Sequence, residues 1–205
     1  LPSLWSNKHS HIQDLRSRYR SEGDGKYYHT ANPWEGQDGY DTVEWLADAE
    51  WSSGKIGTMG SSHRAITQTQ LALENPPHLS AMWVEAGPTN IFSHEAREGG
   101  AMSLQMFAAL HLHALDAQEI QDDPNKARII IEGMRDMKSW ISKFPIKPGE
   151  TALRVAPCLE KTAFDYYYRG IYDDWWNQEC CNQERVMGKH ADVPMVLACG
   201  WYDNF

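Results

Sequence analysis

The segment that most constrains the fold runs from Gly54 to Ala72, because an apolar run, a corner of small residues and a helical pattern follow one another directly. The run contains Ile56 and Met59, and the corner is Gly60-Ser61-Ser62. The helical pattern places four apolar residues on one side, namely Ala65, Ile66, Ala72 and Leu73. The segment therefore predicts a strand, a sharp turn and a helix.

A serine at such a turn has a chemical use. Strained dihedrals lift its side chain away from the sheet, and the first N–H groups of the helix point to where an oxyanion would form. We predict that Ser62 is a nucleophile and that the backbone N–H of His63 is an oxyanion donor. The pattern departs from Gly-x-Ser-x-Gly at Arg64, which stands where the second glycine belongs. On the turn alone, an ordinary strand-to-helix connection remains the alternative.

The segments after the turn predict an α/β core. Pro76-Pro77 ends the helix, and the apolar run Leu79–Ala86 predicts the next buried strand. A strand, a helix and a strand in this order require a right-handed crossover and a parallel sheet. Val193–Ala198 predicts another buried strand, and Asp203 follows it at the edge where ligand chemistry gathers in open α/β sheets. We therefore expect Ser62 and Asp203 at the same rim.

Between these strands the pattern is helical. One stripe consists of Leu104, Phe107, Ala108, His111 and Leu115, and a second of Ile130, Met134, Met137 and Ile141. A third helix is predicted over residues 160–168. The chain order predicts three parts: residues 1–90 as the N-terminal part of an α/β core with the nucleophile turn, 91–190 as a helical cap insertion, and 191–205 as the return strand with the acid loop.

Upstream of the turn the pattern is less regular. Residues 11–14 predict the end of a strand, residues 23–39 a loop, and residues 40–49 a helix of about three turns. Trp45 and Trp51 are interpreted as core residues, since large aromatic side chains dominate ordinary packing. The basic cluster is interpreted as a solvated or ion-paired loop; it consists of Arg16, Arg18 and Arg20.

Composition excludes several function classes. A net charge of −9 over 205 residues argues against a nucleic-acid partner, whose phosphates need clustered Lys and Arg. No apolar run approaches the roughly 20 residues that span a bilayer, so we expect no membrane partner. The four cysteines lack C-x-x-C spacing, which favours free thiols, and neither a metal nor another cofactor is predicted. We expect a soluble protein, with the cytoplasm favoured over secretion, and the compartment stays open.

An ordered set of motifs extends from about residue 11 to the end of the chain: Arg16–Gly23, Asp38–Ala47, Glu50–Gly60, Thr67-Gln68, Asn75–Leu79, Gly99–Ala101, Tyr172–Trp175 and Cys199–Asp203. The set resembles the X-Pro dipeptidyl-peptidase and cocaine-esterase-like (CocE/NonD, S15) serine hydrolases. The resemblance implies an α/β-hydrolase core with an inserted helical cap. It also implies that Asp203 is the acid of a Ser-Asp-His triad and that Phe205, with Trp201 and Tyr202, contacts the substrate.

The same resemblance implies parts that cannot be matched to this sequence. Its histidine comes from a loop after the aspartate, its second oxyanion donor is a tyrosine upstream of the residue 16–23 turn, and a β-sandwich domain follows the hydrolase domain. Only two residues follow Asp203, so we expect an internal fragment of a longer hydrolase whose histidine lies outside this chain. The less favoured alternative is that a histidine of this chain replaces it, the candidates being His63, His94, His111, His113 and His190.

Two function classes remain. The first is a serine hydrolase that cleaves a small-molecule ester or a peptide X-Pro amide through an acyl-enzyme, with ester and amide both open. The second is a non-catalytic α/β-hydrolase-like binding or interaction protein. The aromatic cluster between Tyr166 and Trp176 predicts either cap core and rim or a substrate lining. Asp173 and Asp174 could hold a substrate ammonium, and self-association of the chain stays open.

Overall fold

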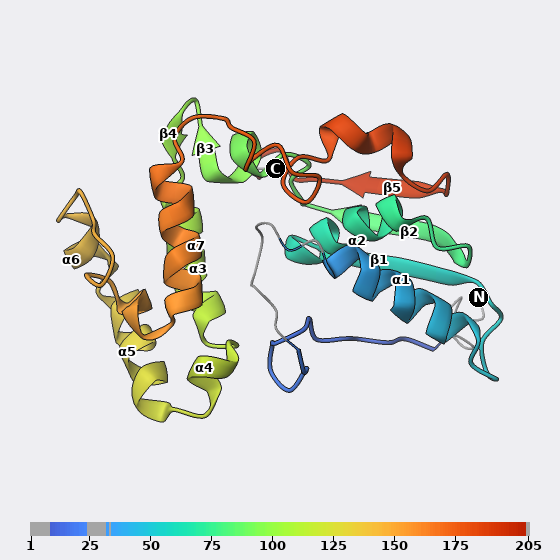
Figure 1. Ribbon diagram of the computed structural model, residues 1–205, viewed down its shortest axis with the longest axis horizontal. Coiled ribbons are helices and arrows are strands. Elements are labelled where there is room, and N and C mark those ends of the chain that lie inside the picture. The colour runs from blue at the N-terminus through green and yellow to red at the C-terminus, as the bar shows by residue number, and fades with distance from the viewer. Residues whose placement is uncertain (1–8, 24–31, 33, 204–205) are drawn as a thin grey trace.

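The computed structural model describes residues 9–23, 32 and 34–203. A sheet with its covering helices forms one end of the molecule and a group of helices the other (Figure 1). The first end contains α1 (Trp34–Ala47), β1 (Ile56–Ser61), α2 (His63–Glu74), β2 (Leu79–Glu85), η3 (Glu184–Lys189) and β5 (Met195–Ala198). The second contains η1 (Phe92–Ala96), β3 (Arg97–Glu98), β4 (Ala101–Met102), α3 (Leu104–Ala114), α4 (Gln118–Gln121), α5 (Pro124–Arg135), α6 (Met137–Ile141), η2 (Ala152–Val155) and α7 (Pro157–Tyr168).

The sheet is parallel, as predicted, and its strand order is β1-β2-β5. The register pairs Ser61 with Glu85, and Glu85 with Ala198, so the three strands end in one row. Their carboxyl ends face the helical part (Figure 1). The fold class is therefore α/β, with the helices between β2 and β5 placed beside the carboxyl edge of the sheet.

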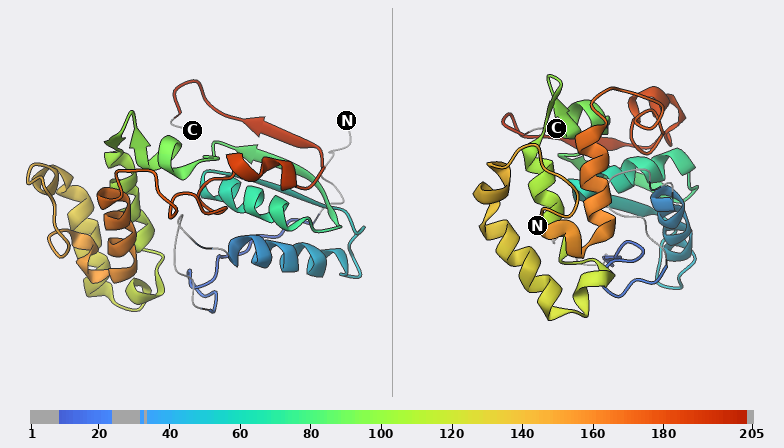
Figure 2. Two further views of the ribbon diagram at one scale, coloured as in Figure 1. Left: turned by 45° about the horizontal axis from the view of Figure 1, so that its top comes forward. Right: turned by 60° about the vertical axis from the view of Figure 1, so that its left-hand side comes forward.

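Helices α1 and α2 cover one face of the sheet (Figure 2). A core lies beneath them, formed by Val43, Ala65, Leu71, Ala72, Leu79, Met82 and Val84. Asn75 ends α2 in the left-handed conformation, with a φ of 52°, and the two prolines follow it. The strand, turn and helix predicted around residue 62 are confirmed.

Helix α1 begins earlier than the sequence pattern predicts. Residues 34–39, which we expected to be loop, form its first turns because two glycines let it approach α2 closely. A Cβ atom at Gly36 would lie 2.8 Å from the carbonyl oxygen of Gln70, and one at Gly39 would lie 3.2 Å from the Leu71 side chain. These glycines permit helix packing here, whereas in the sequence they resemble helix breakers.

The opposite face of the sheet is uncovered in the described residues. Met59, Trp83 and Val196 are neighbours in the register, and their exposed fractions are 72%, 47% and 46%. Strand β5 is only partly buried, since Leu197 is also exposed, so the prediction of a buried strand over residues 193–198 is wrong.

Trp45 and Trp51 are not core residues either. Their exposed fractions are 63% and 51%, because they lie on the outer side of α1 and in the turn that follows it. Their rings contact His11 and His9, respectively, with centroids 6.0 and 4.6 Å apart. Residues 11–14, predicted to end a strand, form no regular secondary structure.

The helical part has its own hydrophobic core, which includes the buried side chains of Phe107, Leu110 and Leu159. The second predicted stripe is divided between α5 and α6, because Asp136 interrupts the helix between Met134 and Met137. The third predicted helix is α7, which begins three residues earlier than expected, at Pro157. Within residues 9–23, 32 and 34–203, no helix is long and apolar enough to cross a bilayer.

The N-terminal loop connects the two parts. Arg16 pairs with Asp38 on α1, and buried Arg18 pairs with Asp116 at 2.9 Å, between α3 and α4. The backbone N–H of Tyr19 also donates to the carbonyl oxygen of Asp116 at 3.1 Å. Within the described residues, Arg16 and Arg18 of the basic cluster are therefore ion-paired.

Candidate active site

Ser62 stands at the corner between β1 and α2. Its φ is 60° and its ψ is −127°, a conformation that residues other than glycine rarely adopt. Its backbone N–H donates to the carbonyl oxygens of Glu85 and Ala86, each at 3.0 Å, which holds the corner against the end of β2. The residue is exposed, and its hydroxyl does not cap α2. A strained, exposed serine between a strand and a helix is the geometry expected of a nucleophile elbow.

Two glycines leave the space that this corner needs. A Cβ atom at Gly60 would lie 2.6 Å from the Cβ of Arg64, and one at Gly87 would lie 2.4 Å from the Cβ of Ala65. Both distances are far below an ordinary carbon–carbon contact of about 3.5 Å. Gly60 therefore lets α2 turn back over β1, and Gly87 lets the chain after β2 cross the first turn of α2.

His63 is the first residue of α2, so its backbone lies at the positive end of the helix dipole. Its ring is buried, and its Nε2 lies 3.2 Å from Oε1 of Glu35 on α1. The imidazole therefore contacts α1, whereas the backbone of His63 lies at the corner beside Ser62.

Asp203 follows β5, as Ser62 follows β1. Since the two strands end in one row with β2, both residues belong to the carboxyl edge of the sheet. The backbone N–H of Asp203 donates to the carbonyl oxygen of Gly200 at 3.1 Å, which forms a turn after the strand, and the residue is exposed. The adjacent Trp201 and Tyr202 are fully exposed, and Phe205 lies outside the described residues.

Comparison with known proteins identifies the family of the chain. A model of the X-Pro dipeptidyl-peptidase (S15) family matches residues 9–205. The chain belongs to this family. A curated relative is the cocaine esterase of Rhodococcus sp. (strain MB1 Bresler), which is 24% identical over 201 residues, covering 95% of this chain and 33% of the esterase.

Solved structures also resemble this S15 chain. A crystal structure of an aminopeptidase from a marine sediment Thaumarchaeota archaeon matches with a TM-score of 0.61 and 19% identity, over 93% of this chain and 31% of that one. A CocE/NonD family hydrolase from Staphylococcus aureus matches with a TM-score of 0.47 and 22% identity, over 87% of this chain and 25% of that one. The aminopeptidase supports the α/β-hydrolase-like fold, and the S15 chain spans about a third of the length of the cocaine esterase.

Two of the other candidate histidines, His111 and His94, have ring partners that the structure shows. His111 is fully buried on α3, where its ring stacks on Trp140 with centroids 5.3 Å apart and its Nδ1 lies 3.1 Å from the carbonyl oxygen of Phe107. His94 lies 3.7 Å from Glu184. Burial lowers the pKa values of His111 and His190, so both rings favour the neutral form.

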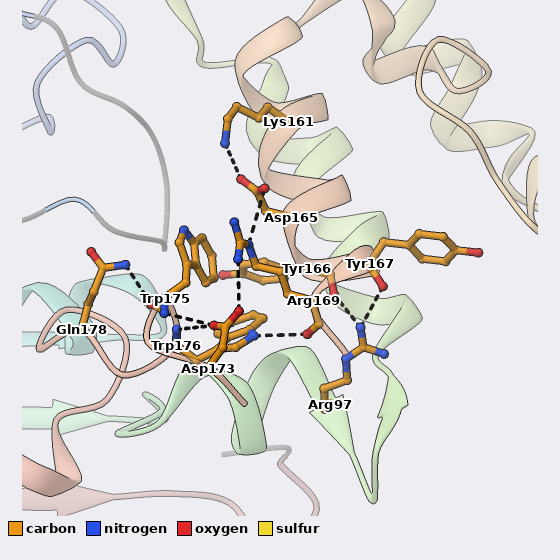
Figure 3. Close-up of polar contacts among 10 residues, drawn as sticks. All are labelled: Arg97, Lys161, Asp165, Tyr166, Tyr167, Arg169, Asp173, Trp175, Trp176 and Gln178. Atoms are coloured by element: carbon orange, nitrogen blue, oxygen red, sulfur yellow. Dashed lines mark hydrogen bonds and ion pairs between the residues drawn. The ribbon is translucent and has the colours of Figure 1, made fainter. Parts of the chain in front are cut away.

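The aromatic cluster at the end of α7 divides into core and rim. Tyr166 and Trp176 are buried, whereas Tyr168 and Tyr172 are exposed by 61% and 39%. Asp173 accepts from the backbone N–H groups of Trp175 and Trp176, at 3.0 and 3.3 Å, and from Arg169 at 3.2 Å (Figure 3). Its carboxylate therefore stabilises the turn after α7, which leaves it fewer acceptor sites for a substrate ammonium.

Arg97 has a structural role that the sequence analysis missed. Its Nη2 donates to the carbonyl oxygens of Tyr166 and Tyr167, both at 2.8 Å, and so satisfies the C-terminal end of α7 (Figure 3). Burial lowers the pKa of this guanidinium. Its partners lie about 70 residues away in sequence, so no local pattern could indicate them.

Two surface hollows lie away from the elbow. One, of about 430 Å³, is lined by Pro148 and one side of α7, and the other, of about 370 Å³, is lined by His11, Gln13 and the outer side of α1. Neither lining includes Ser62 or Asp203. In the described part of the chain, His, Cys, Asp and Glu form no group of three or more that could hold a metal ion.

Proposed function

We propose that this S15 chain carries the nucleophile and the acid of a serine hydrolase that cleaves an ester or an X-Pro amide through an acyl-enzyme. The observation that carries the proposal is the conformation of Ser62, whose φ of 60° is kept at an exposed corner by the spaces at Gly60 and Gly87. Strain of this kind costs on the order of 1–3 kcal/mol and concentrates at functional sites.

The proposed chemistry follows from the elbow. Oγ of Ser62 attacks the carbonyl carbon of the substrate while a histidine takes the hydroxyl proton, and the oxyanion forms opposite the backbone N–H of His63. The carbon–oxygen or carbon–nitrogen bond then breaks, and the histidine returns the proton to the leaving alcohol or amine. Water releases the acyl group from Ser62 by the same steps in reverse order.

Asp203 is the proposed partner of that histidine. Neighbouring strands lie about 4.8 Å apart, so β1 and β5 lie roughly 10 Å apart across β2. This separation leaves room for an imidazole between a serine after β1 and a carboxylate after β5. In α/β-hydrolases the histidine follows the acid in chain order, so we assign it to polypeptide after Asp203.

The test is the hydrolysis of p-nitrophenyl acyl esters and of X-Pro p-nitroanilides by the full-length protein. Ser62→Ala should lower kcat by about 10⁴-fold or more, as expected when a triad member is removed. Ser61→Ala is the matched control, because it removes the same hydroxyl from the preceding residue, and it should keep kcat within threefold. Equal losses in the two variants, or full activity in Ser62→Ala, would refute the assignment. The substrate that is turned over decides between ester and amide.

A further inference from the structure

Two glutamate–histidine pairs connect α1 to residues at opposite ends of the sheet, one to the start of α2 and one to the residue before β2. Glu35 contacts His63 at 3.2 Å beside the carboxyl ends of the strands, and Glu44 contacts His78 at 2.7 Å just before β2 begins. The side chains of the first pair are 2% and 7% exposed, and those of the second are 24% and 41% exposed. The buried pair is therefore the one that adjoins Ser62.

Oε1 of Glu35, which contacts His63, accepts a second hydrogen bond. The side-chain Nδ2 of Asn32 donates to this Oε1 at 3.2 Å, and the side-chain Oδ1 of Asn32 accepts from the backbone N–H of Trp34 at 3.2 Å. Glu35 is also in the first turn of α1, where the helix dipole stabilises a negative charge. Its position is fixed in turn by the close packing of Gly36 against Gln70 on α2.

This arrangement restricts the position of His63, the residue after Ser62. The His63 side chain is fastened to α1, while its backbone N–H is the proposed oxyanion donor at the start of α2. Such a donor must lie within about 0.5 Å of its productive position, and a displacement of 1 Å can cost about 100-fold in rate.

We propose that Glu35 is a positioning residue, which orients the first turn of α2 through its hydrogen bond to the His63 ring and so aligns the His63 N–H with the oxyanion. The inference rests on the proposed acyl-transfer function. Glu35 itself does not touch the reacting atoms. Its loss acts on the transition state, in which the oxyanion develops, more than on substrate binding.

The test compares three substitutions of Glu35 in the full-length protein with one matched control. Glu35→Leu removes both hydrogen bonds, Glu35→Asp keeps the charge but shortens the reach, and Glu35→Gln keeps the reach and an acceptor oxygen. Glu44→Leu removes the corresponding pair from the other end of α1. The readouts are kcat and KM for the best p-nitrophenyl ester, together with the unfolding midpoint in urea.

The proposal predicts that Glu35→Leu lowers kcat at least tenfold with KM changed less than twofold, and that Glu35→Gln keeps kcat within threefold. Glu44→Leu should keep the wild-type kcat. If Glu35→Leu does not fold, the test is whether kcat is higher in Glu35→Gln than in Glu35→Asp. The proposal expects this order because it requires the contact with the His63 ring rather than the charge. Wild-type kcat in Glu35→Leu or Glu35→Asp, or an equal loss in Glu44→Leu, would overturn the proposal.

The two proposals fail in different ways. If wild-type protein is inactive towards every ester and amide, or if Ser62→Ala is as active as wild type, the proposed function fails and with it the basis of the positioning role. If wild type is active and Ser62→Ala is not, but the Glu35 variants match wild type, only the positioning role fails.

Discussion

Gly87→Ala tests whether the space over the first turn of α2 is what permits the elbow. The added Cβ would lie 2.4 Å from the Cβ of Ala65, which is 1% exposed and belongs to the core beneath α2. An ordinary carbon–carbon contact needs about 3.5 Å, so the chain after β2 or the start of α2 must shift by about 1 Å. Overpacking of this kind costs about 1–3 kcal/mol of unfolding free energy.

The catalytic effect should exceed the effect on stability, because the shift falls on the turn that presents Ser62. A misplacement of about 1 Å can lower kcat by about 100-fold. The assay is kcat and KM for a p-nitrophenyl ester with the full-length protein, alongside urea unfolding. Gly188→Ala is the control, since its new Cβ would meet nothing within 4 Å. Wild-type kcat and stability in Gly87→Ala would refute the steric argument.

Three further predictions concern stability. Burial lowers the pKa of His111, so the unfolded chain binds a proton more readily than the folded one, and the unfolding free energy should fall as pH drops below about 6.5. His111→Phe should remove this part of the pH dependence, which urea melts at pH 5 and 7.5 would measure. Burial raises the pKa of Glu95 to about 8, so this residue should cost stability as pH rises from 4.5 to about 8, and Glu95→Gln should flatten the profile over that window. Arg97→Met leaves two carbonyl oxygens of α7 without their charged donor and should cost about 3 kcal/mol, whereas Arg128→Met, which breaks an exposed pair with Glu132, should cost less than about 1 kcal/mol. Equal losses in these two variants would contradict the role given to Arg97.

The elbow could be predicted from sequence because its causes are local. A short apolar run, Gly60 and the following helical pattern lie within about twenty residues, and the sharp corner at Ser62 follows from them. The parallel sheet could also be predicted from chain order. A strand, a helix and a strand that follow one another in this way form a right-handed connection between two parallel strands. Asp203 at the same edge followed from the parallel direction of β5.

The errors arose where packing overrides a local signal. Gly36 and Gly39 resemble helix breakers, yet they lie inside α1 because α2 passes close to them. The residue type of Trp45 predicts a core position, but its burial depends on which side of the helix faces the sheet. Glu35 contacts a residue 28 positions away in sequence, and Arg97 contacts residues about 70 positions away. Hydrophobic periodicity carries no information over such separations.

The most direct test of the central claim is to identify the residue that an active-site-directed fluorophosphonate modifies in the full-length protein. We predict a single phosphonylated residue, Ser62, found by mass spectrometry of the peptide that spans β1 and α2, with loss of hydrolase activity in proportion to labelling. Modification of Ser61 or of any other residue in its place, or no modification in a preparation that hydrolyses esters, would contradict the account.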